Sequence, residues 1–171
     1  MKGQEENDVL LFNSPVETGV RALVVLNAVY PRALDLSQLT WFDHLVVHTA
    51  DIGGPASLHP DVPQRSGELF VRRRLIEESL ILMRRLHLVS VLVEDLGITY
   101  QASDEAPAFV KFMKSKYARD LKERAQWLAQ HICSLDAASI KDLITERIGR
   151  WNIEFQGEGY PEWRLLWTPA E

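Results

Sequence analysis

The stretch LVSVLVEDLGITYQA, residues 88–102, decides the fold that we predict for this chain. Residues 88–93 are apolar and rich in β-branched side chains, residues 94–97 have the composition of a turn, and residues 98–102 alternate as a returning strand does. The segments before this stretch follow the helical period instead. Three helices followed by a hairpin is the layout of a winged helix, so we predict a mostly α protein with a small β-hairpin.

Two of the three helices have clear start signals. The first is expected to begin at Asn13-Ser14-Pro15, where a capping residue is followed by a proline that suits the first turn, and to end at Tyr30-Pro31. The second is expected to run from a cap at Asp35 or Ser37 to about Thr49. Both carry apolar residues at helical spacing, so both should bury one face in a common core.

A loop and a third helix complete the part before the hairpin. Residues 50–67 are rich in glycine and proline and predict a long ordered loop. The third helix is expected from Glu68, with Ile76, Leu80 and Met83 in one apolar stripe. Residues 1–102 are therefore predicted to form the winged-helix domain.

Helices are also predicted after the hairpin. Residues 103–105 are a strong cap, and the apolar residues between 109 and 132 predict one bent helix or two successive ones, followed by a further helix from Leu135. We interpret residues 103–152 as a C-terminal helical extension. Residues 153–171 are short, aromatic and interrupted by glycine and proline, and we interpret them as an aromatic tail that packs against something.

Composition limits the classes of function. The chain has 24 acidic and 19 basic residues, so no overall positive field draws it to nucleic acid or to an anionic membrane. Residues 1–8 are polar and acidic, unlike the cationic and apolar regions of a signal peptide, and no apolar run reaches the ~20 residues that span a bilayer, so we expect a protein that is neither secreted nor embedded in a membrane. The single cysteine, Cys133, falls in an apolar helical pattern and suits a reducing compartment, so we expect a cytoplasmic protein.

The densest group of candidate metal ligands lies at the end of the second predicted helix and in the loop after it. His44 and His48 are one helical turn apart, and Asp43, Asp51 and His59 lie near them in sequence. The pair resembles the two histidines of a zincin helix, but apolar residues stand where that motif has its glutamate base. We therefore expect these side chains to order the 50–67 loop and expect no metal.

Catalytic motifs have no positive support. Gly53-Gly54 lacks the lysine and the strand-to-helix context of a phosphate-binding loop, and no serine lies in a nucleophile elbow. We expect a protein that is not an enzyme and has no cofactor.

Five arginines on the third predicted helix are candidate contacts to a DNA backbone, because this helix corresponds to a recognition helix. Glu77 and Glu78 share the surface, and a helical face of mixed charge is usually solvated, so we prefer a solvated or protein-contacting face. The candidate DNA-binding residues are Arg72, Arg73, Arg74, Arg84 and Arg85.

Tryptophan and tyrosine often anchor protein interfaces, so the aromatic residues are candidate contacts to a partner. For Trp41, in an apolar helix, burial in the core is the preferred interpretation. For the aromatic tail, an interface is as well supported as packing within the chain. The candidate partner-binding residues are Tyr160, Trp163 and Trp167.

Several segments of the chain resemble the middle component of bacterial ABC-three-component systems. They are LFNSPVETGVR (11–21), HTADIGGP (48–55), SLHP (57–60) and GEL (67–69), and the similarity runs from about Val9 to Phe155. None of these motifs is catalytic.

The resemblance implies a small winged-helix accessory subunit that binds an SMC-like ABC ATPase and an associated nuclease effector in Lamassu-type defence against phages and plasmids. ATP hydrolysis and DNA cleavage would then belong to the partners. An alternative is a winged-helix DNA-binding regulator, with the third helix and residues 88–102 on the duplex, and a contact to DNA within the defence complex is open as well. A metal-dependent enzyme built on His44, His48 and Asp51 is a distant third.

Overall fold

The computed structural model describes residues 14–60, 65–132, 134–135, 138–140 and 142–143. Over this part of the chain it is mostly helical with one two-stranded antiparallel sheet, as predicted. The elements in chain order are α2 (Pro15–Val29), α3 (Leu36–Val47), the 3-10 helix η1 (Thr49–Ile52), α4 (Arg65–Arg85), β1 (Val89–Glu94), β2 (Gly97–Ala102), α5 (Ala106–Phe112) and α6 (Lys116–Ile132).

Local capping explains where the first two described helices begin. The Ser14 hydroxyl accepts a hydrogen bond from the Glu17 amide at 3.2 Å, and Pro15 occupies the first turn, as the sequence predicts. At α3 the cap is Asp35 and not Ser37. Asp35 accepts from the Gln38 amide at 2.8 Å, and the Gln38 side chain accepts from the Asp35 amide at 2.9 Å. This reciprocal pair satisfies two amides that a helix start would otherwise leave without partners.

Other boundaries differ from the predictions. Helix α4 begins at Arg65, three residues before the expected Glu68, so the predicted 50–67 loop is shorter than expected. After the hairpin, the segment expected as one bent helix or two forms two, α5 and α6, separated by residues 113–115. Of the further helix expected from Leu135, only short pieces are described, and Cys133, Trp151 and the aromatic tail lie outside the described residues.

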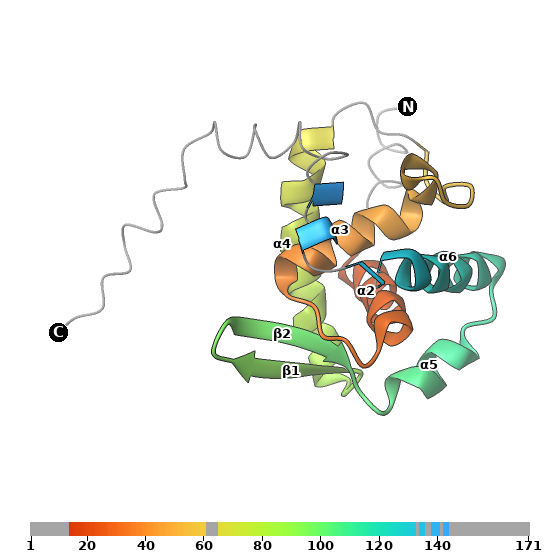
Figure 1. The fold of residues 1–171 in the computed structure, drawn as a ribbon. Helices are drawn as coiled ribbons and strands as arrows, with labels where there is room; N and C mark the ends of the chain where they lie inside the picture. The colour runs from red at the N-terminus through yellow and green to blue at the C-terminus, as the bar shows by residue number, and fades with distance from the viewer. Residues whose placement is uncertain (1–13, 61–64, 133, 136–137, 141, 144–171) are drawn as a thin grey trace, which may run out of the picture.

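Helix α2 lies at the centre of the molecule, with α3, α4 and α6 packed around it (Figure 1). Residues before and after the hairpin share one hydrophobic core, because α6 packs on α2 and α3. Trp41 is partly buried and packs against this core. The largest fully buried side chains include Leu23, Leu26, Phe42, Ile76, Leu121 and Leu128. None of the helices over the described ranges is both long enough and apolar enough to cross a membrane.

The hairpin projects from the helical body (Figure 1). Its register pairs Val89 with Ala102 at the base and Glu94 with Gly97 at the tip. Gly97 has φ 129°, a backbone conformation that side chains with a Cβ rarely adopt, so glycine suits this end of the turn. The outer edge of β2 is joined to Leu34, whose amide and carbonyl bond to Tyr100 at 2.9 and 2.8 Å.

The segment after α3 is ordered by hydrogen bonds and close packing. The Val47 carbonyl accepts from the Leu58 and His59 amides at 2.9 and 3.2 Å. Arg124 of α6 donates to the Ala56 carbonyl at 3.1 and 3.2 Å. A Cβ on Gly54 would lie 2.7 Å from the ring of Trp127, so glycine is needed where the segment meets α6. The segment is thus held against α6.

Candidate partner-binding surfaces and the polar centre

A buried ionic cluster joins three helices at the centre of the protein. The Asp43 carboxylate of α3 is fully buried and lies between Arg21 of α2 and Arg72 of α4. Arg21 donates from Nε to Oδ1 at 2.9 Å and from Nη2 to Oδ2 at 3.3 Å, which is a bidentate pair. Arg72 donates from Nη1 to Oδ2 and, at 3.4 Å, to the Asp43 carbonyl. We call these three residues the ionic centre.

The ionic centre is charged despite its burial. Burial alone would raise the pKa of Asp43, but the two guanidinium groups outweigh it and hold that pKa below its ordinary value. Burial would likewise lower the pKa of Arg21, and the attraction of Asp43 more than compensates, so the pKa of Arg21 is raised. Both shifts favour the charged forms of Asp43 and Arg21. Because its three residues come from different helices, the cluster holds α2, α3 and α4 in one arrangement.

One of the five arginines predicted to lie on the surface belongs to the ionic centre instead. Arg72 was expected on the exposed face of α4, but it points inward and is buried, so it is not available to a DNA backbone. The prediction missed this because the negative partner, Asp43, is 29 residues away in sequence.

The other four arginines of the set are exposed, but two of them have partners within the chain. Arg73 donates to the Ser37 hydroxyl at 2.9 Å, and Arg74 pairs with Glu78 at 3.3 Å. Arg84 and Arg85 lie in the last turn of α4. The exposed surface of α4 therefore has mixed charge, which only weakly supports contact with DNA phosphates.

The histidines flank the ionic centre. The rings of His44 and His48 lie 4.5 Å apart between centroids, and those of His48 and His59 lie 6.3 Å apart. A hydrogen bond of 3.0 Å joins His59 Nε2 to the hydroxyl of Tyr117 on α6. Across the described ranges, no group of three or more His, Cys, Asp or Glu side chains is placed to hold a metal ion. What the contacts show is that His59 ties the segment after α3 to α6.

The environment of His59 favours its neutral form. Burial, followed by the positive charges of Arg21 and Arg72, lowers the pKa of His59 from 6.5 to about 4. A neutral imidazole can share a proton with the Tyr117 hydroxyl, whereas a protonated one would add a third cation beside the two arginines.

The hairpin carries an apolar face that the core covers only at its base. Val89 and Ala102 are buried, and Val91 and Tyr100 are partly buried. Farther along the same face, Val93 is 80% exposed and its cross-strand partner Ile98 is 53% exposed, while Leu96 in the turn is fully exposed. The alternation in sequence predicts the strands but does not tell how far the body of the protein covers them.

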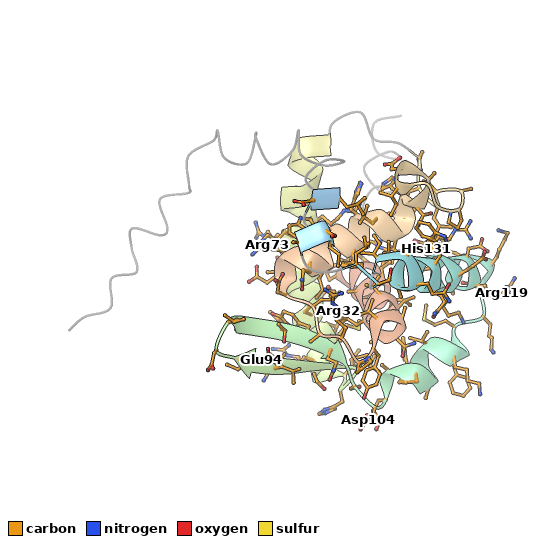
Figure 2. The ribbon with its side chains drawn as sticks, viewed as in Figure 1. Arg32, Arg73, Glu94, Asp104, Arg119 and His131 are labelled. Carbon is orange, nitrogen blue, oxygen red and sulfur yellow. The ribbon has the colours of Figure 1, made fainter. Side chains whose placement is uncertain are left out.

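The charge of the hairpin is entirely acidic. From Leu86 to Val110 the sequence has no lysine or arginine, and its acidic residues are Glu94, Asp95, Asp104 and Glu105. Figure 2 shows Glu94 at the free end of the hairpin and Asp104 beyond its base. A hairpin of this composition would repel the DNA backbone that the wing of a DNA-binding protein would approach.

The remaining predicted site residues, Tyr160, Trp163 and Trp167, lie outside the described residues. Two features were not predicted from the sequence, the ionic centre and the exposed end of the hairpin. One signal was present for the first, since Arg21 stands between Val20 and Ala22 and Asp43 directly follows Phe42, and a charge among buried apolar residues needs a partner.

Comparison with known proteins identifies the family. The family model described as ABC-three component (ABC-3C) system Middle Component 2 matches residues 11–154, which cover the ionic centre, the hairpin and α6. No curated protein and no solved structure matches the chain, so the winged-helix assignment stays a prediction. The chain belongs to the Middle Component 2 family of ABC-three component systems.

Proposed function

We propose that this protein is a non-catalytic accessory subunit that binds the ABC ATPase of its three-component system. In the proposal the ATPase is SMC-like, an associated nuclease effector is a further partner, and the assembly is a Lamassu-type bacterial defence complex against phages and plasmids. The family name supports a role within a system of several components. The order of three helices and a hairpin supports a winged-helix body, as in the resemblance noted above.

The main support for a protein-binding role is the composition of the exposed end of the hairpin. It exposes apolar side chains, which favours contact with another protein, and its charges are acidic, which disfavours contact with DNA. A DNA-binding regulator would need several cations without partners on one surface. On α4, Arg72 belongs to the ionic centre and Arg74 pairs with Glu78, so this surface offers fewer cations than the sequence predicts.

Co-expression with the ABC ATPase of the same three-component system tests the proposal. The two proteins are expected to co-purify through a tag on either one, and to elute together in size-exclusion chromatography. A folded, monodisperse chain that never associates with that ATPase would contradict the proposal.

A DNA titration separates the alternative function. The wild type and a variant with Arg73, Arg74, Arg84 and Arg85 changed to alanine are titrated with duplex DNA at low and at physiological salt. We expect no difference between them at physiological salt. Binding that is strong, falls steeply with salt and is lost in the variant would favour the DNA-binding regulator.

A further inference from the structure

The exposed apolar side chains of the hairpin are continuous with the core. The residues that pair across the strands on this face are Val89 with Ala102, Val91 with Tyr100, and Val93 with Ile98. Exposure rises along these pairs from the buried base to the bare end. The hairpin thus extends an apolar face past the point where its own protein covers it, which costs solubility unless another surface covers it.

The exposed apolar end of the hairpin consists of Val93 and Ile98, which pair across the strands, and Leu96 in the turn between them. We call these three residues the hairpin surface.

Charge distinguishes among the protein segments that could dock on the hairpin surface. Its neighbours Glu94 and Asp95 are acidic and exposed, and neither forms an ion pair with any other described residue. The aromatic tail, residues 153–171, has four acidic residues and one arginine, so like charges oppose its docking here. A second copy of the chain would bring another acidic hairpin and a net charge of −5. A basic partner is the complementary choice.

We infer that the hairpin surface docks on an apolar segment flanked by lysine or arginine side chains on the ABC ATPase subunit. The inference rests on the proposed function, because that function supplies the partner. In this arrangement Val93, Leu96 and Ile98 lose their contact with water, and Glu94 and Asp95 pair with the flanking cations at the rim.

Binding to the purified ATPase subunit tests the apolar part of the inference. Val93→Thr, Leu96→Ser and Ile98→Thr are combined in one variant, which keeps β-branched residues on the strands while removing apolar surface. We expect this variant to weaken the affinity for the ATPase by about 100-fold, because burial of several large apolar side chains is lost. The control is Val71→Thr, which changes an exposed valine on α4 outside the hairpin surface and should bind as the wild type does.

The charge part of the inference has its own matched pair. A Glu94→Lys/Asp95→Lys variant should lose about 10-fold in affinity at low salt and less at high salt, since rim charges are screened. Asp104→Lys reverses an acidic residue beyond the base of the hairpin and should change the affinity little.

The outcomes separate the two proposals. If the wild type and the hairpin variants bind the ATPase equally well, the inference about the hairpin surface is wrong, but the proposed function is not contradicted. A wild type that does not bind the ATPase overturns both. If the variants keep full affinity for the ATPase but lose a self-association seen in the wild type, the surface belongs to a second copy of the chain, and the inference is wrong.

Discussion

Removal of the central negative charge gives the most direct test of how the helices are held together. In Asp43→Asn the side chain keeps its size and one oxygen acceptor, but Arg21 and Arg72 lose the buried carboxylate that both of them contact. Breaking a buried ion pair by removing one partner costs about 3–5 kcal/mol. A domain has a total stability of about 5–15 kcal/mol, so the loss is a large share of it.

The measurement is chemical and thermal unfolding of purified wild type and variant. For a chain of this size the loss corresponds to a fall of about 10 °C in the unfolding midpoint. Asp120→Asn is a matched control, because it removes a carboxylate from an exposed pair with Lys116 at 2.6 Å on one helix, and its midpoint should not change.

The dependence on pH follows from the lowered pKa of Asp43. A carboxylate whose pKa is lower in the folded state adds stability above its unfolded pKa of about 3.9 and loses it as the pH falls through the folded value. The stability difference between wild type and Asp43→Asn should therefore be constant near neutral pH and shrink below about pH 4. A variant as stable as the wild type at pH 7 would refute the idea that the ionic centre holds the three helices.

Three further predictions concern the packed loop and the hairpin. Gly54→Ala should destabilise the protein by about 1–3 kcal/mol in urea unfolding, because the added Cβ would lie 2.7 Å from the ring of Trp127; an unchanged midpoint would mean that the loop does not pack there. His59 should titrate in NMR spectra at about pH 4. Its contribution to the stability of the fold should be complete above pH 6.5 and fall towards pH 4, and the His59→Gln variant should not show this loss. A titration midpoint of His59 near pH 6.5 would contradict its buried position. The combined Val93, Leu96 and Ile98 variant should unfold within about 0.5 kcal/mol of the wild type, since these side chains are exposed, and a larger loss would mean that they serve the fold.

The elements of the fold could be predicted from the sequence because their signals are local. The side chains of Ser14 and Asp35 each accept a hydrogen bond from an amide three residues later in the chain. The start of each helix can therefore be predicted from a few neighbouring residues. The alternation in residues 89–102 likewise predicts the hairpin, since each strand pairs with its neighbour across a short turn. The predicted start of α4 is three residues too late, because Gly67 was counted with the glycine- and proline-rich loop before it.

Only the tertiary structure decided which charges are buried and which apolar residues are bare. Arg72 looks like one of three adjacent surface arginines, and its inward position depends on Asp43, 29 residues away, and through it on Arg21 of a third helix. Burial of a charge is stable only beside its partners, and the packing of three helices brings those partners together. Likewise, the sequence by itself determined that residues 89–102 form a hairpin with an apolar face. Only the packing of the helices determines that the end of this face is exposed, because the exposure of a side chain depends on everything that packs around it.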